Sequence, residues 1–239
     1  MKIIKVENYE TLSKKAAEII AAQVAEKPAS ILGLATGSTP VGAYQELIRM
    51  YKRGEVDFAG VTAFNLDEYH PVKKSGDQSY DYFMKEKFFN HVNVAKTFIP
   101  NGEAADHAAE CENYEKLVYE SGGIDLQLLG IGNNGHIGFN EPADHFPAAT
   151  HYVALDESTI KANARFFENE SDVPKNAITM GIRTIFKAKK IMLLASGAGK
   201  AECIKEMVGG KITPKNPSSI LQLHPDVTII VDKDAGRLL

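Results

Sequence analysis

Short apolar runs alternate with helical patterns along the chain, and this alternation constrains the fold more than any other feature. The run 31–35 (ILGLA) is apolar throughout, as is typical of a strand covered on both faces of a sheet. Strand alternating with helix predicts an α/β fold with a doubly wound, mainly parallel sheet and helices on both faces, a Rossmann-like architecture. The predicted strands are 3–6, 31–35, 61–66, 124–130, 190–195 and 227–231, and the predicted helices are 9–25, 41–53, 80–90, 106–120 and 200–208.

Size and composition fit a single soluble domain over residues 1–239, without repeats or a linker. The net charge of −4 argues against a nucleic-acid or anionic-membrane partner, so an anionic ligand must be held by local features. No run approaches the ~18 apolar residues of a membrane span, and we do not expect the N-terminal segment to be a signal peptide, because charges interrupt its short apolar run. Cys111 and Cys203 lie far apart in helical patterns, which favours a reduced, cytoplasmic setting.

The segment 133–174 departs from the regular alternation. It contains three prolines and has weak periodicity before about residue 157. A stretch of this length without regular structure is typical of an active-site loop or lid, with 143–149 as the part that would close over a substrate.

Ligands of open parallel sheets bind beyond the carboxyl ends of the strands. The first such end carries Thr36, Gly37, Ser38, Thr39 and Pro40. We expect Thr39 to cap the following helix and Pro40 to be its first residue. Amide groups at a helix start, with hydroxyls nearby, suit a phosphate. The loop lacks the ending of a Walker A motif, and a plain strand–turn–helix corner is the alternative.

Two adjacent acids, Asp67 and Glu68, follow the strand at 61–66. A carboxylate at a strand end can perform acid–base chemistry, but neighbouring side chains should point to different sides. From this pattern alone, a helix cap or a solvated loop is the favoured interpretation.

The third end, 130–142 (GIGNNGHIGFNEP), is the most informative. It matches G-x-G-x-x-G literally, yet a dinucleotide site needs this motif to open a helix, and glycine and proline interrupt any helix here. We therefore reject a dinucleotide site. The glycine-rich loop presents His136 and Glu141, and a nearby carboxylate is the usual means of orienting an imidazole for proton transfer.

The fourth end, 195–200 (ASGAGK), offers backbone amides and the ammonium of Lys200 to an anion. Arg165 is a further candidate cation, with a plain helix-surface charge as its alternative. The histidines show no metal-ligand spacing, so no metal site is expected. No nucleophile motif is present either.

Together these loops resemble the glucosamine-6-phosphate deaminase (isomerase) family, in its short-chain, non-allosteric form. The resemblance covers essentially the whole chain and rests on 32–40 (LGLATGSTP), 65–69 (NLDEY), 130–142, 162–167 (ANARFF) and 221–224 (LQLH). It implies conversion of D-glucosamine 6-phosphate and water to D-fructose 6-phosphate and ammonia, with neither a metal nor an organic cofactor.

The resemblance also implies roles for individual residues. His136 matches the ring-opening residue, Glu141 the carboxylate that assists it, and Asp67 the base that moves a proton from C2 to C1. The substrate phosphate is expected on Thr36, Gly37, Ser38 and Thr39, with Arg165 and Lys200 as its cations.

Two departures from the family pattern lead to further expectations. Some members carry an aspartate where this chain has Asn134, which we therefore take as an orienting group. The positions matching the effector site of long members, Asp144, His151, Val153 and Ala154, lack its cationic pair. We therefore expect that the effector of the long members does not activate this protein. We also expect a monomer or small homo-oligomer.

Two alternative functions stay open. A 6-phosphogluconolactonase resembles this family in fold and phosphate loop, although the 65–69 and 130–142 segments favour the deaminase. A sugar-phosphate sensor should carry a DNA-binding helix-turn-helix, whereas the first 30 residues are predicted to hold only one strand and one helix. A sensor should also have no need for Asp67, His136 and Glu141 together.

Overall fold

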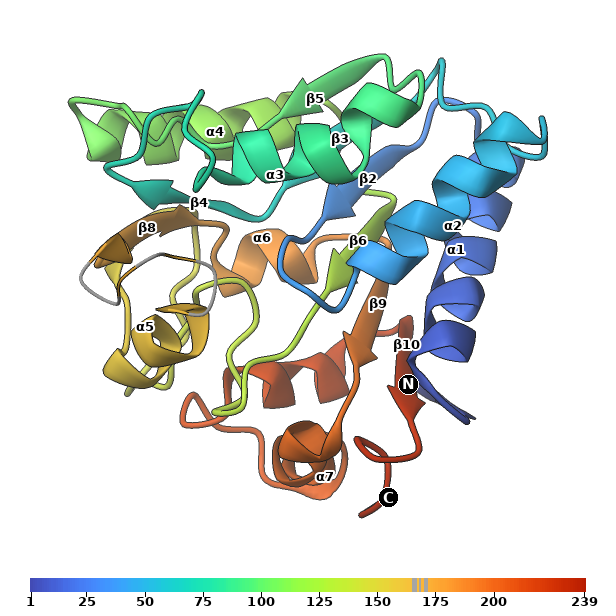
Figure 1. The fold of residues 1–239 in the computed structure, drawn as a ribbon. Helices are drawn as coiled ribbons and strands as arrows, with labels where there is room; N and C mark the ends of the chain where they lie inside the picture. Colours follow the sequence, from blue (N-terminus) through green and yellow to red (C-terminus); the bar gives the residue numbers. More distant parts are fainter. Residues whose placement is uncertain (165–166, 168, 170–171) are drawn as a thin grey trace.

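A parallel sheet of seven strands forms the centre of the computed structural model, which describes residues 1–164, 167, 169 and 172–239 (Figure 1). This arrangement confirms the predicted doubly wound α/β architecture. The chain runs outward from β2 in one direction and later returns to the other side of β2, so the switch point lies between β2 and β6. The order is β1 (Lys2–Val6), β10 (Val227–Asp232), β9 (Lys190–Ala195), β6 (Leu126–Leu129), β2 (Ile31–Leu34), β3 (Thr62–Asn65) and β5 (Lys96–Phe98).

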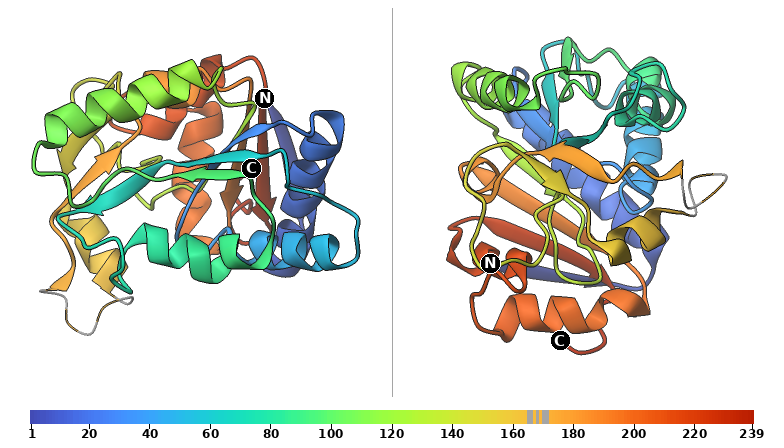
Figure 2. Two further views of the ribbon diagram at one scale, coloured as in Figure 1. Left: turned by 90° about the horizontal axis from the view of Figure 1, so that it is seen from above. Right: turned by 90° about the vertical axis from the view of Figure 1, so that its left-hand side faces the viewer.

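Helices cover both faces of this sheet, with α1 to α3 on one face and α4 on the other (Figure 2). The α-helices are α1 (Tyr9–Glu26), α2 (Val41–Lys52), α3 (Tyr80–Lys87), α4 (His107–Glu120), α5 (Glu157–Asn163), α6 (Ile182–Phe186) and α7 (Ala201–Gly209). Short 3-10 turns are η1 (Phe89–His91), η4 (Ala198–Lys200) and η5 (Pro217–Leu223).

Local sequence explains the best-defined elements. Asn8 precedes α1 and its side chain accepts the amide of Thr11, which caps the helix. All four residues of β2 and of β6 are buried, as the continuous apolar runs predict for strands covered on both faces. One hydrophobic cluster fills the space between the sheet and its helices.

A second, antiparallel sheet of three strands was absent from the predicted fold. It consists of β4 (Asp67–His70), β8 (Asn176–Thr179) and β7 (His151–Ala154). The prediction of a loop after residue 66 is therefore wrong, because the chain passes from β3 through Leu66 directly into β4. Leu66 forms the junction: its amide donates to the Leu34 carbonyl, and its carbonyl accepts from the amide of Met180.

The segment 133–174 likewise contains β7 and α5 rather than one long loop. These elements are too short to show a clear period in the sequence. Residues 143–149 are held by hydrogen bonds from the amides of Ala143 to Pro214 O, of Ile182 to Pro147 O and of Arg183 to Ala148 O. Residues of α5 line part of the cavity described below, and residues 143–149 do not. Closure over a substrate stays a prediction.

Two further observations bear on the setting of the protein. Cys111 and Cys203 are buried and form no disulfide, as their separation predicts. In the described part of the chain, no helix has the length and apolar character needed to span a membrane.

Candidate active site

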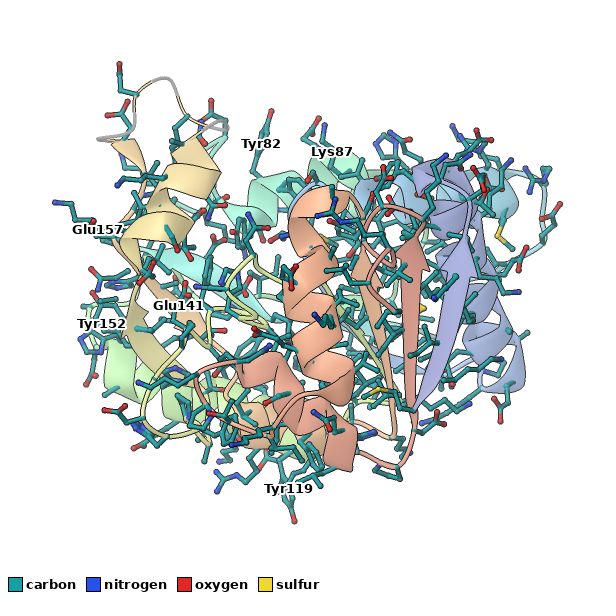
Figure 3. The ribbon with its side chains drawn as sticks, turned by 90° about the horizontal axis from the view of Figure 1, so that it is seen from below. Tyr82, Lys87, Tyr119, Glu141, Tyr152 and Glu157 are labelled. Atoms are coloured by element: carbon teal, nitrogen blue, oxygen red, sulfur yellow. The ribbon has the colours of Figure 1, made fainter. Side chains whose placement is uncertain are left out.

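A cavity of about 580 Å³ lies at the carboxyl ends of the central strands, next to the β2–β6 switch point. It brings together most of the residues singled out in the sequence. Glu141 lies behind His136 and does not line the cavity. Figure 3 shows Glu141 inside the fold, whereas Tyr119 projects from the surface. The predicted site residues that line the cavity are Thr36, Gly37, Ser38, Thr39, Asp67, Asn134, His136 and Lys200.

The loop 36–40 connects β2 to α2 and forms one wall of the cavity. Gly37 has a φ of +86°, a left-handed conformation that glycine adopts without steric cost. The helix begins at Val41, with Pro40 at the N-cap position and no side-chain capping hydrogen bond. The prediction that Thr39 caps α2 is therefore wrong, and Thr39 lines the cavity instead.

Asp67 and Glu68 open β4 and point to different sides, as strand alternation predicts. Asp67 is only 6% exposed and lines the cavity. Burial, with a smaller contribution from the charge of Glu68, raises the pKa of Asp67 to about 8. Such a carboxyl can exchange a proton near neutral pH.

Glu68 has a structural role. Its carboxylate accepts hydrogen bonds from the amides of Tyr69 (2.9 Å), Tyr80 (2.8 Å) and Asp81 (3.0 Å), and thereby caps the first turn of α3. Burial raises the pKa of Glu68 to about 7, and these three hydrogen bonds limit the rise. The helix-cap interpretation is thus confirmed for Glu68, whereas acid–base chemistry at Asp67 stays a prediction.

His136 and Glu141 form a pair, with Nδ1 of the imidazole 3.2 Å from Oε2 of the carboxylate. The amide nitrogen of Asn134 donates to the same oxygen at 2.8 Å. The side-chain carbonyl of Asn134 also accepts the backbone amide of His136 at 3.2 Å, so this residue contacts both members of the pair. The expected orienting role of Asn134 depends on these two contacts and stays a prediction.

Close packing holds the imidazole in place. A Cβ atom added to Gly132 would lie 2.3 Å from the His136 ring, so only glycine leaves room for the imidazole. Burial acts to raise the pKa of Glu141, but hydrogen bonds from His136, Thr159 and Asn134, together with the charge of His136, lower it overall. The carboxylate is therefore suited to stay ionised and to stabilise a protonated imidazole.

Thr159 is a site residue that the sequence patterns did not reveal. It comes from α5, is only 4% exposed, and its hydroxyl donates to Oε1 of Glu141 at 2.5 Å. Each carboxylate oxygen of Glu141 thus has a donor of its own. No local pattern marks this threonine, because α5 lies in the segment expected to be a loop.

The turn 196–200 has fewer backbone amides available to an anion than the sequence predicts, because one of them, that of Gly197, already donates to a carboxylate. The carboxylate of Asp232, at the end of β10, accepts from Ser196 Oγ at 2.5 Å and from the amide of Gly197 at 3.0 Å. Lys200 itself lines the cavity, and α7 begins one residue after it. Asp232 was also missed, since a lone acid at a strand end carries no specific signal.

Two other expectations concern charge and metals. Arg165 lies outside the described residues, so its place relative to the cavity is not given by the structure. Among the residues that are described, no group of three or more His, Cys, Asp or Glu side chains could hold a metal ion.

Comparison with known proteins finds relatives that match the whole chain. The glucosamine-6-phosphate deaminase of Halothermothrix orenii is 57% identical over 100% of both chains. That of Thermoanaerobacter pseudethanolicus is 58% identical over all of this chain and 95% of the relative. The structure of a monomeric glucosamine-6-phosphate deaminase, 47% identical, matches with a TM-score of 0.98 over 100% of both chains.

More distant structures share the fold alone. A 6-phosphogluconolactonase from Shewanella baltica has a TM-score of 0.77 at 18% identity, over 97% of each chain. The family of glucosamine-6-phosphate isomerases and 6-phosphogluconolactonases matches residues 5–230. This chain therefore belongs to the glucosamine-6-phosphate isomerase/6-phosphogluconolactonase family.

Proposed function

We propose that this protein is a glucosamine-6-phosphate deaminase, which converts D-glucosamine 6-phosphate and water to D-fructose 6-phosphate and ammonia. One observation carries the proposal: a single cavity is lined by two separate proton-transfer groups, Asp67 and the imidazole of His136, which is paired with Glu141 behind it. A lactonase needs one activated water, whereas an amino-aldose must have its ring opened and a proton moved between two carbons. Two independent groups fit the second requirement.

Ring opening is assigned to His136. The imidazole moves a proton between the anomeric hydroxyl and the ring oxygen, which requires it to donate and accept in turn. Glu141 stabilises the protonated form through the 3.2 Å contact with Nδ1. Asn134 and Thr159 hold that carboxylate in one orientation through hydrogen bonds to its two oxygens.

Proton transfer between carbons is assigned to Asp67. Its carboxylate removes the proton from C2 of the open chain and returns a proton to C1, which gives the imine of the ketose. Water adds to C2 of this imine and the C2–N bond breaks, releasing ammonia. A pKa raised to about 8 makes the carboxylate a stronger base than an exposed aspartate.

The substrate phosphate is assigned to the loop 36–40, with Lys200 and Arg165 as its cations. The first-turn amides of α2 carry the positive end of a helix dipole, which favours an anion. We further propose that residues 1–239 act as one domain, in the cytoplasm, as a monomer or small oligomer. The monomeric state of the deaminase of known structure supports this last point.

The test is turnover of D-glucosamine 6-phosphate by the purified protein, with fructose 6-phosphate and ammonia measured together. We expect the two products in a 1:1 ratio, and turnover lowered by about 10²- to 10⁴-fold in Asp67→Asn. Hydrolysis of 6-phosphogluconolactone without deamination would assign the lactonase reaction instead. Saturable sugar-phosphate binding without turnover of either substrate would indicate a sensor.

A further inference from the structure

Tyr9, the first residue of α1, contacts the loop 36–40 from outside the site cavity. Its hydroxyl donates to the carbonyl oxygen of Ser38 at 3.0 Å and accepts the backbone amide of Gly42 at 2.9 Å. One side chain from another helix thus joins the loop to the first turn of α2.

This contact replaces a missing helix cap. The first amides of a helix have no partner within it, and α2 has proline at its N-cap and no side-chain capping hydrogen bond. The Tyr9 hydroxyl provides the acceptor for one of these amides, that of Gly42. A Cβ atom at Gly42 would lie 2.2 Å from Ser13 Oγ and 3.0 Å from the Tyr9 hydroxyl, so the close approach of α1 and α2 depends on this glycine.

The same contact orients the loop toward its ligand side. A trans peptide is planar, so its carbonyl and its N–H point in opposite directions. Because the Ser38 carbonyl is held toward Tyr9, the amide N–H of Thr39 must point away from Tyr9. Ser38 and Thr39 line both the 580 Å³ site cavity and a neighbouring cavity of about 720 Å³, whereas Tyr9 lines only the neighbouring one.

We propose that Tyr9 is a positioning residue for phosphate binding, and that it acts by fixing the Ser38–Thr39 peptide while the adjacent Gly37 leaves the loop free to turn. Gly37, with a φ of +86°, has more backbone freedom than any other residue type would have there, so a contact from another helix helps to hold the loop in one conformation. This inference rests on the proposed function, which assigns the substrate phosphate to the loop 36–40. Tyr9 itself takes no part in proton transfer.

The test is Tyr9→Phe, which removes only the hydroxyl. Tyr82→Phe is the matched control, because Tyr9 and Tyr82 are 38% and 40% exposed and Tyr82 projects outward from α3 (Figure 3). The measurements are kcat and KM for glucosamine 6-phosphate, and the Kd of inorganic phosphate by calorimetry. We expect Tyr9→Phe to raise KM and the phosphate Kd by roughly 5- to 10-fold, the size expected for the net loss of one hydrogen bond, with kcat within about twofold.

Each other outcome has a definite meaning. An unchanged phosphate Kd would overturn the inference, as would a lower melting temperature with unchanged KM, which indicates a purely structural role. Absence of phosphate binding by the unmodified protein would also overturn it. If the protein bound phosphate but turned over no glucosamine 6-phosphate, the proposed reaction would fail while the phosphate Kd still tested Tyr9.

Discussion

Replacement of Asp67 by asparagine should strongly lower activity and at the same time stabilise the fold. Asparagine has nearly the same shape as aspartate but cannot take a proton from carbon, so turnover should fall by about 10²- to 10⁴-fold. The gain in stability follows from burial of the carboxyl, which lies at 6% exposure beside Glu68. The neutral amide avoids the cost of ionising a group at this position.

The size and sign of the effect follow from the raised pKa. The carboxyl titrates near 3.8 when exposed and at about 8 in the folded protein. Between these values the folded state keeps a proton that the unfolded state has lost, so the free energy of unfolding of the unmodified protein falls as pH rises. The stability that this proton provides is fully present below pH 4 and is lost by about pH 8.

The Asp67→Asn substitution removes this titration. For one titrating group, the free energy of unfolding cannot change by more than about 1.4 kcal/mol per pH unit. The full shift in the pKa of Asp67 therefore limits the change in this free energy to about 6 kcal/mol. Since the carboxyl lines a cavity that admits water, we expect about half of this, roughly 3 kcal/mol in favour of Asp67→Asn at pH 9 and a small difference at pH 4. For a chain of this length, that corresponds to roughly 6–12 °C in melting temperature.

The assay is urea unfolding followed by circular dichroism at several pH values from 4 to 9. Glu112→Gln, an exposed carboxyl of α4, is the control. The stability difference between Asp67→Asn and the unmodified protein should widen with pH, whereas Glu112→Gln should show no such widening. Parallel curves for Asp67→Asn and the unmodified protein would refute the argument that burial raises this pKa.

Three further substitutions test the His136–Glu141 pair. Asn134→Ala removes one donor to Glu141 and should lower kcat about 10-fold and raise the pKa of that carboxyl, seen as a shifted limb in the pH–rate profile; an unchanged profile would count against a role for Asn134. Thr159→Val keeps the shape and removes the other donor, so a similar loss of kcat without a change in KM is expected, and Thr159→Ser should restore it. Gly132→Ala should lower kcat more than 10-fold by displacing the imidazole, which histidine NMR resonances would detect.

Much of the architecture follows from local patterns. The apolar runs that became β2 and β6 predict strands covered on both faces, and their alternation with helices predicts the parallel sheet. A parallel sheet brings the carboxyl ends of its strands to one edge, so local patterns alone predict that the loop 36–40, Asp67 and His136 lie near one another. The absence of a helix after the glycine-rich loop likewise excluded a dinucleotide site.

Local patterns could not predict the second sheet, nor the hydrogen bonds that hold the site residues in place. Strand β4 consists of polar and aromatic residues and is a strand only because it pairs with β8, more than a hundred residues later. Thr159 and Asp232 contact Glu141 and Gly197 from separate elements, 18 and 35 positions away in the chain. Such contacts leave no period in the sequence, because they depend on where separate elements meet.

What the sequence by itself determined is the set of chemical groups and the edge of the sheet at which they lie. Tertiary structure decided what each group does there. Asp67 and Glu68 are adjacent acids in the chain, and burial raises the pKa of both, yet Asp67 lines the cavity without a backbone donor among the described residues, whereas Glu68 caps α3 and its rise is limited by three amide hydrogen bonds. The difference arises because burial and hydrogen-bond partners set the protonation of a carboxyl, and both are properties of the packed fold rather than of the residue.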